Sequence, residues 1–453
     1  MAKVVNGKNM ITHPSTSQIY NHPVEILQKL IRFNTINPPG NEAECIAYIR
    51  DLLSDANIAY KIFAKTPNRP NLVAHIKGKG KARPLLLYGH VDVVTTEGQQ
   101  WDYPPFEGRL VDGVVWGRGA LDMKGGIAMI LAALLRVKAE GFQPDGDIVL
   151  AVVSDEELGG EFGAKFLVDH HADLFKDIRY AIGEFGGFSV YIGKKRFYPI
   201  TISEKQICWI RATVHGKGGH GAFPVRGGAM AKLSMLLKQL DENALPAHIT
   251  PASKMMIEAT ASALSGIQGI LIGQLNNPVM TNTILKLLGI RGNNLHPLFH
   301  NTVSSTILHG SKTINVIPST VSVDLDGRLL PGFTPGDMIR ELRPIVGDNV
   351  DLEVIRFDAG PAQPDMGLFD VLSMTLREAD PDGIPVPFVI GGVTDGRYFS
   401  KLGIQTYGFL PMNLPKDFNF PATIHAENER VPASAIEFGT NAIFKVLQQF
   451  GHD

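Results

Sequence analysis

The sequence contains few cysteines and no long apolar run. Its two cysteines, Cys45 and Cys208, lie far apart in unrelated surroundings, which excludes a disulfide framework and indicates buried thiols in a reducing compartment. No apolar stretch approaches the ~20 residues that a transmembrane helix needs. The first eight residues lack the apolar segment of a secretory signal peptide. Together these absences predict a cytoplasmic protein.

The sequence also has no large excess of charge of either sign. The 43 basic and 45 acidic residues give a formal net charge of −2, which argues against a nucleic-acid partner and against a basic patch for membranes. Apolar residues make up 44% and charged residues 19% of the chain, as in globular proteins. Because 453 residues exceed one ordinary core, we expect two domains.

The stretch from Arg83 to Gly126 holds the first candidate site residues. Residues 84–88 form a short apolar run closed by a glycine, which predicts a buried strand that ends at His90. His90 and Asp92 are two residues apart and therefore share a face of an extended segment. A metal-bound imidazole usually needs an acceptor for its second ring nitrogen, and a neighbouring carboxylate such as that of Asp92 meets this need.

Asp122 precedes an apolar helical pattern that we expect to form a helix from Met123 to about Gly141, with one apolar side. Two roles are open for this aspartate. It is either the N-cap of that helix or an oxygen ligand for a metal at the positive end of the helix.

Further acids stand at the ends of two other predicted strands. The strand predicted over residues 147–154 is followed by Asp155, Glu156 and Glu157, and the strand over 180–183 is followed by Glu184. Ligands of open α/β sheets bind at the carboxyl ends of the strands. Acids that converge there repel one another unless a cation lies between them, so a divalent metal is the expected solution.

These motifs, in this order, resemble those of the M20 metallopeptidase family, which includes glutamate carboxypeptidase, succinyl-diaminopimelate desuccinylase, aminoacylase and acetylornithine deacetylase. The resemblance spans residues 23–446, and the segment 407–411 is similar to the carboxypeptidase S-like branch. It rests on the following segments: Gly89-His-Val-Asp92, Gly119-Ala-Leu-Asp-Met-Lys-Gly-Gly126, Asp155-Glu-Glu157, Glu184, Gly216-Lys-Gly-Gly-His-Gly-Ala-Phe-Pro224 and His425-Ala-Glu-Asn-Glu429.

The resemblance implies a site with two divalent metal ions, most simply Zn²⁺, with Co²⁺ or Mn²⁺ as alternatives. Asp122 would bridge the ions and carry a cis peptide bond to Met123, while a water bridges them and Glu156 acts as the general base. Asp92 joins Glu156 as a catalytic residue. The implied metal ligands are His90, Asp122, Glu157, Glu184 and His425.

The resemblance also implies residues that reach the substrate. His220, after a glycine-rich loop, would reach the partner subunit's active site and stabilise the oxyanion, although an ordinary surface histidine is the alternative. Asn315 and Arg328 would hold substrate, with a structural ion pair as the alternative for Arg328. Thr394 and Asp395 would lie near substrate, although Asp395 could instead pair with Arg397.

The predicted fold is α/β. A zinc-peptidase-like catalytic domain, with a mixed sheet flanked by helices, would be interrupted by an α+β domain that serves as lid and dimer interface. The predicted boundaries are residues 1–203 and 359–453 for the catalytic domain and 204–358 for the inserted domain. Between the inserted domain's first helix and its next strand, residues 243–301 are expected to form two helices.

The predicted function is metal-dependent hydrolysis of an amide bond in dipeptides, small peptides or N-acyl amino acids, by a cytoplasmic homodimer. The alternative is a non-catalytic protein that keeps the fold and binds peptides or amino acids. The presence of Glu156 beside a complete ligand set argues against that alternative.

Overall fold

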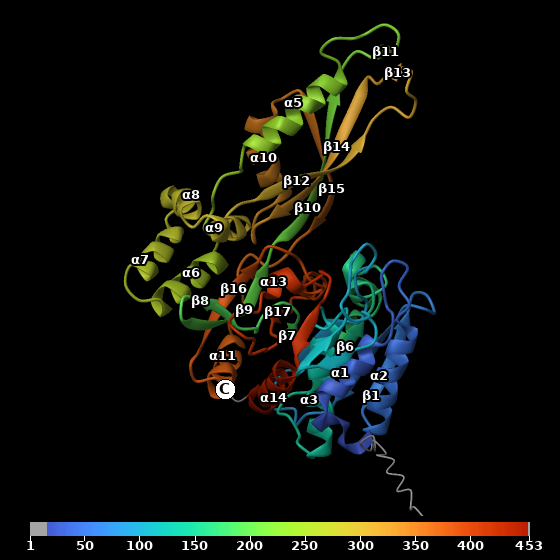
Figure 1. Ribbon diagram of the computed structural model, residues 1–453, viewed down its shortest axis with the longest axis vertical. Coiled ribbons are helices and arrows are strands. Elements are labelled where there is room, and N and C mark those ends of the chain that lie inside the picture. Colours follow the sequence, from blue (N-terminus) through green and yellow to red (C-terminus); the bar gives the residue numbers. More distant parts are fainter. Residues whose placement is uncertain (1–15, 452–453) are drawn as a thin grey trace, which may run out of the picture. The chain divides into compact units, whose positions relative to one another are not determined.

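The computed structural model describes residues 16–451, so the N-terminal segment examined for a signal peptide lies outside the described residues. The chain forms two compact units (Figure 1). The first unit comprises the chain up to Gly163 and again from Met412, and the second unit comprises Ala164–Pro411. Within residues 16–451, no helix is both long and apolar enough to cross a membrane.

The sheet of the first unit has the strand order β1-β2-β6-β3. β1 and β2 pair antiparallel, as do β2 and β6, whereas β3 runs parallel to β6 with His90 opposite Val153. Every residue of β3 and β6 is buried, which explains their unbroken apolar sequences. The strands are β1 (Ala59–Ala64), β2 (Pro70–Ile76), β3 (Leu85–His90) and β6 (Ile148–Val153).

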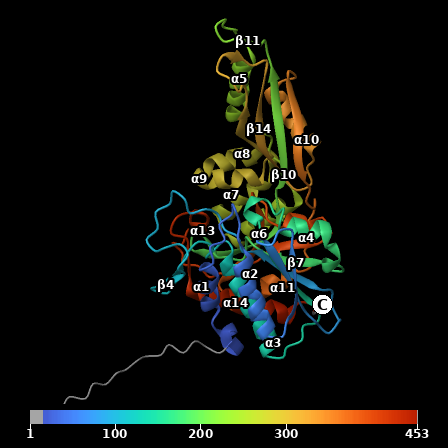
Figure 2. The same cartoon turned by 90° about the vertical axis from the view of Figure 1, so that its right-hand side faces the viewer.

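Within the described residues the first unit has four helices of nine or more residues, and one of them, α3 (Lys124–Ala139), packs on β3. Its predicted single apolar side is wrong, because nearly all of its side chains are buried. The reason is that α1 (Pro23–Ile31) and α14 (Ala433–Gln449) pack against α3 on the sides not covered by β3. Both views place these three helices side by side (Figures 1 and 2). The fourth helix, α2 (Ala43–Asp55), packs on β1 and β2.

The second unit contains the parallel pair β7 (Tyr180–Gly183) and β17 (Gln405–Gly408), followed in the sheet by β9 (Lys195–Glu204) and β16 (Gly383–Ile390). β8 (Val190–Ile192) forms a hairpin with β9. Three helices of this unit follow or precede these strands in the chain: α4 (Ala164–His170), α11 (Phe369–Ala379) and α12 (Gly396–Ser400).

A separate antiparallel sheet of the second unit has the order β12-β14-β10-β15. Two helices that contact each other, α5 (Ala229–Glu242) and α10 (Pro335–Val346), cover it and form a core with its inward side chains. The sheet begins at Gln206 and ends at Asp358, close to the predicted boundaries 204 and 358, and the division into domains stays a prediction. Its strands are β10 (Gln206–His215), β12 (Thr302–His309), β14 (Thr320–Leu329) and β15 (Val350–Asp358).

Residues 243–301 contain more helix than the two helices predicted. Thr250 caps the first of them through the backbone N–H of Ser253, and Asn277 caps the third through Val279. The prediction undercounted because each helix is short and glycines at 266 and 289 separate them. The helices are α6 (Pro251–Ala263), α7 (Ile267–Gly273), α8 (Pro278–Leu287) and α9 (Ile290–Leu295), with 3₁₀ turns at Gln274–Asn276 and His296–Leu298.

Candidate metal centre

The candidate centre of the first unit begins where β3 and β6 end. His90 is the last residue of β3, and a hydrogen bond of 3.0 Å from the Val91 N–H to the Val153 carbonyl keeps the two strands in register up to this point. After β6, Asp155 takes a left-handed conformation (φ 72°) and the chain turns into a 3₁₀ turn over Glu156–Leu158. The parallel pairing therefore delivers His90 and the paired glutamates to the same edge of the sheet.

Asp92 contacts both the turn that carries Glu156 and Glu157 and the ring of His90. Its carboxylate accepts hydrogen bonds from the backbone N–H groups of Glu156 (3.1 Å) and Glu157 (3.2 Å) and from Asn37 Nδ2 (2.9 Å). His90 Nδ1 lies 3.0 Å from the backbone carbonyl oxygen of Asp92 and 3.4 Å from its Oδ1. The nearest acceptor for the ring is therefore the carbonyl, and the orienting role of the carboxylate stays a prediction. Burial opposes ionisation of Asp92, yet the contacts with His90 and Asn37 hold the pKa of its carboxyl below the usual value.

Asp122 faces a different imidazole with each of its carboxylate oxygens. Oδ1 lies 3.1 Å from His90 Nε2, and Oδ2 lies 3.1 Å from His425 Nε2. Asp122 is not the N-cap of α3, since that position belongs to Met123 and no side chain caps the helix. The predicted cis peptide bond between Asp122 and Met123 is confirmed.

Glu157 completes the group. Its Oε1 lies 3.3 Å from His425 Nε2, and candidate ligand atoms of His90, Asp122 and Glu157 all lie within 4.8 Å of one another. Burial and the neighbouring Asp122 carboxylate raise the pKa of Glu157 to about 7. Hydrogen bonds to Asp122 and Glu157 raise the pKa of His425 to about 10. Two imidazoles around two crowded carboxylates form a mixed nitrogen and oxygen donor set that fits Zn²⁺ and similar divalent ions.

Glu156 reaches the same group from the adjacent position. One of its carboxylate oxygens lies within 4.8 Å of a ring nitrogen of His90. Both glutamates therefore face the centre, and their separate roles, base and ligand, stay predictions.

Sequence reasoning missed Glu429 as a functional residue. Its buried carboxylate accepts hydrogen bonds from the backbone N–H groups of Gly119 (3.1 Å), Leu121 (2.8 Å) and Asp122 (3.2 Å), and from Arg118 Nη1 (2.6 Å). Arg118 Nη2 in turn donates to the His425 carbonyl (3.2 Å). The pair thus holds the loops of two candidate ligands together. The sequence signal that could have identified Glu429 was its position at the end of the His425–Glu429 motif.

Replacing Glu429 with Gln is expected to weaken metal binding about 10–100-fold, as loss of outer-shell partners typically does. The Gln amide NH₂ would face N–H donors, leaving buried donors unpaired. The measurement is a metal titration of the metal-free protein. Glu427→Gln is the matched control, since Glu427 is exposed and accepts only from the Gln100 N–H among these loops. Equal metal affinity in the two variants would contradict the positioning role.

The second unit holds the remaining predicted residues. Glu184 directly follows β7 and is buried, and its role as a ligand stays a prediction. His220 belongs to β11 (Gly219–His220), which pairs with β13 (Val316–Ile317). The Gly221 N–H donates to the Asn315 carbonyl at 2.8 Å, so the pairing of these two strands, which are far apart in the sequence, brings His220 and Asn315 together. Both side chains are exposed.

The other predicted substrate residues have partners within the second unit. Arg328 makes two hydrogen bonds to the Asp326 carboxylate, of 2.8 and 3.0 Å, which is the structural pair considered from the sequence. The Thr394 hydroxyl donates to Glu204 (2.9 Å), and Asp395 is buried. Burial raises the pKa of Glu204 to about 7. The substrate-binding roles of Arg328, Thr394 and Asp395 stay predictions.

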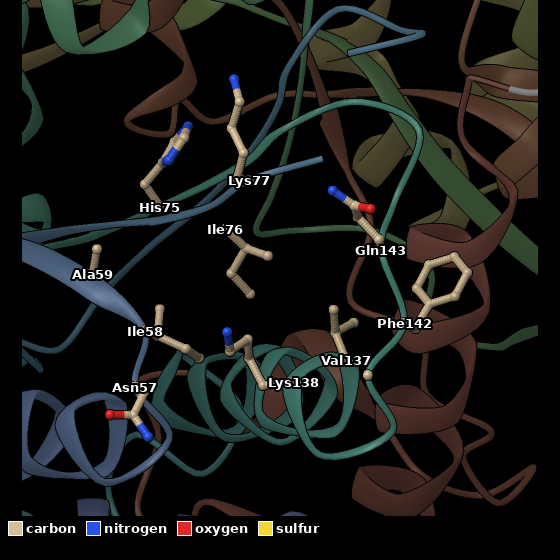
Figure 3. Close-up of a pocket in the computed structure, with 11 residues that line it drawn as sticks. Asn57, Ile58, Ala59, His75, Ile76, Lys77, Val137, Lys138, Phe142 and Gln143 are labelled. Atoms are coloured by element: carbon tan, nitrogen blue, oxygen red, sulfur yellow. The ribbon is translucent and has the colours of Figure 1, made fainter. Parts of the chain in front are cut away.

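A hollow of about 490 Å³ lies elsewhere in the first unit, between the end of β2 and the C-terminal end of α3 (Figure 3). Because β2 runs antiparallel to β6, its last residue Ile76 lies opposite Ile148, at the start of β6 and away from Val153. Figure 3 shows Lys138 pointing into the hollow and His75 and Lys77 pointing away from it. None of the predicted site residues lines it.

Comparisons with known proteins agree with these observations. The chain is 28% identical to the N-fatty-acyl-amino acid synthase/hydrolase PM20D1 of Bos taurus, over 82% of this chain and 75% of that protein. It is 28% identical to the probable carboxypeptidase S-like 2 of Dictyostelium discoideum, over 76% and 68%. The M20 family metallo-carboxypeptidase structure from Sulfolobus solfataricus shares the fold, with a TM-score of 0.69 and 15% identity over 95% of this chain and 99% of that one.

A family model covers most of the chain. The model described as peptidase family M20/M25/M40 matches residues 86–449, which include every candidate ligand named above. The chain therefore belongs to peptidase family M20/M25/M40 and is a metal-dependent hydrolase of amide bonds.

Proposed function

We propose that the protein binds two divalent metal ions, with Zn²⁺ as the first candidate, and hydrolyses N-acyl amino acids or small peptides. The observation that carries the proposal is the placement of Asp122, whose two carboxylate oxygens each lie 3.1 Å from a different imidazole nitrogen. A carboxylate that faces two separate nitrogen donors suits a bridge between two ions. The proposed ligands are His90, Asp122, Glu157, Glu184 and His425.

When bound, the ions polarise the scissile carbonyl and lower the pKa of water. Glu156 takes a proton from the attacking water on a carboxylate oxygen and delivers it to the nitrogen of the leaving amine. The Asp92 carboxylate keeps Glu156 and Glu157 in place through their backbone N–H groups. The Asp92 backbone carbonyl, 3.0 Å from His90 Nδ1, and the carboxylate, 3.4 Å from it, keep the His90 ring oriented.

Two classes of substrate are supported by the relatives. One relative is named for the hydrolysis of N-fatty-acyl amino acids, and another is named as a carboxypeptidase. Both names describe the cleavage of an amide bond next to a free α-carboxylate. We assign Asn315, Arg328, Thr394 and Asp395 to holding this substrate. Arg328 suits the carboxylate because a guanidinium binds it through two parallel hydrogen bonds, although substrate would then compete with Asp326.

We also assign the protein to the cytoplasm and to a homodimer formed through residues 204–358. Two buried free thiols agree with a reducing compartment. An exposed apolar set on or next to the paired strands β11 and β13, which includes Phe223, Ile314 and Val316, agrees with a partner at this part of the second unit.

The proposed function predicts that metal-free protein is inactive and that Zn²⁺, Co²⁺ or Mn²⁺ restores turnover. The measurement is the release of free amino acid from a panel of N-acetyl amino acids, N-acyl amino acids of longer chain, and dipeptides. Dipeptides amidated at the carboxyl end serve as the control for recognition of the α-carboxylate. Full metal occupancy with binding of these compounds, but without cleavage of any, would favour the non-catalytic alternative.

A further inference from the structure

The second unit contains an apolar cavity of about 130 Å³ that is partly open to solvent. Helices of the 243–301 segment form one wall, and β8, β9 and β16 form the other. Side chains that line it include Phe197 and Val386 from the strands and Ile257, Ile272, Leu275 and Leu295 from the helical segment. The cavity thus lies between the segment of unassigned function and the sheet.

The lining offers no polar group to a ligand. Its single hydroxyl belongs to Thr260 and donates to the Met256 carbonyl within α6 at 2.8 Å. A dry cavity of this kind does not hold water well, since a buried water needs two or more polar partners. The chemistry of the lining therefore selects an aliphatic or aromatic group.

Two of the strands at the cavity, β8 and β16, are close in the chain to residues proposed for the reaction. Val190, in the lining, follows Glu184 by six residues, and Phe388, also in the lining, precedes Thr394 by six. Six residues span on the order of 20 Å at most. The helical wall continues toward the same loop, because a Cβ placed on Gly391 would lie 3.6 Å from Pro297 Cβ.

The surface of the helical wall suits an anionic amphiphile. Ile267 (81% exposed) and Ile290 (82% exposed) lie on α7 and α9, the same helices that supply Ile272 and Leu295 to the cavity. No aspartate or glutamate occurs between Glu258 and Asp324. This stretch therefore does not repel a molecule that carries a carboxylate and an apolar chain.

We propose that the cavity receives the acyl chain of the N-acyl amino acid substrate and selects long aliphatic chains over acetyl. The inference rests on the proposed function, which it narrows to one class of substrate. With ~30 Å³ for a group the size of a water molecule, the cavity has room for about four methylenes.

A series of acyl chains from acetyl to hexadecanoyl on one amino acid tests the proposal. The expected kcat/KM changes little while the chain is too short to reach the cavity. It then rises about 3–4-fold with each methylene that enters, and levels off after about four. A profile that stays flat over the whole series would overturn the proposal while leaving the proposed function intact.

Two isoleucines of α7 provide matched variants. Ile272→Trp fills the cavity and is expected to lower the ratio of kcat/KM for dodecanoyl to that for acetyl by about 10–100-fold. Ile270→Trp alters an exposed side chain of the same helix (68% exposed) and is expected to keep the wild-type ratio. If Ile272→Trp fails to fold, Ile272→Ala enlarges the cavity and should move the plateau to longer chains. Equal profiles in wild type and either Ile272 variant would contradict the assignment.

Direct binding separates this inference from the proposed function. Dodecanoate is expected to bind the metal-free protein about 10²-fold more tightly than acetate by calorimetry, since about four more methylenes enter the cavity, and Ile272→Trp should remove the difference. This result does not depend on catalysis. If no amide is cleaved and dodecanoate still binds at Ile272, the proposed function fails and the cavity assignment stands. If dodecanoate binds no better than acetate, the cavity assignment fails.

Discussion

Glu156→Gln is expected to lower kcat by about 10²–10⁴-fold, the usual contribution of a general base, while both metal ions stay bound. Gln cannot accept the proton of the attacking water, yet its backbone N–H still donates to Asp92, as that of Glu156 does at 3.1 Å. The fold of the turn is therefore kept. Metal content and kcat are measured on the same preparation, so that loss of turnover is separated from loss of metal.

Glu157→Gln is the matched variant at the adjacent position. Glu157 Oε1 lies 3.3 Å from His425 Nε2, and a carboxylate oxygen of Glu157 lies within 4.8 Å of candidate ligand atoms of His90 and Asp122. Its replacement is expected to reduce metal affinity as well as kcat, because a neutral amide is a weaker ligand than a carboxylate. Equal retention of metal in both variants, or equal loss in both, would refute the separate roles.

The sequence predicted the elements that bring the centre of the first unit together. The apolar runs that end at His90 and Ser154 form β3 and β6, and their parallel pairing places both ends at one edge. These features depend on local pattern, which the sequence displays directly.

Other features depend on packing between distant segments and were not predicted. The burial of α3 on nearly all sides follows from its contacts with α1 and α14. The role of Glu429 arises from hydrogen bonds to residues more than three hundred positions away, such as Leu121. β9, the longest strand of its sheet, has an apolar run interrupted by Pro199, which weakened the strand signal.

His220→Ala is expected to lower kcat by about 10²–10³-fold, the effect of removing one oxyanion donor, with metal content unchanged. The Ala222 N–H donates to His220 Nδ1 at 3.2 Å, which places the proton of the neutral ring on Nε2. The exposed ring therefore presents an N–H donor. His215→Ala is the control, since His215 is also exposed but pairs with Asp351 at 2.7 Å. Similar kcat values for the two variants would contradict the role of His220.

Subunit exchange tests whether His220 acts across the proposed dimer. The strand pair of β11 and β13 carries His220 but none of the proposed metal ligands, so the proposed oxyanion role requires that His220 reach a centre built from other segments. In the proposed two-fold dimer each strand pair would serve the partner's centre, and the relation is reciprocal. Mixing inactive His220→Ala and Glu156→Ala dimers gives mixed dimers in which one of the two sites has both residues. Since half of the dimers are mixed after random exchange, about a quarter of wild-type activity should return. If mass spectrometry confirms exchange and no activity returns, His220 does not act across the dimer.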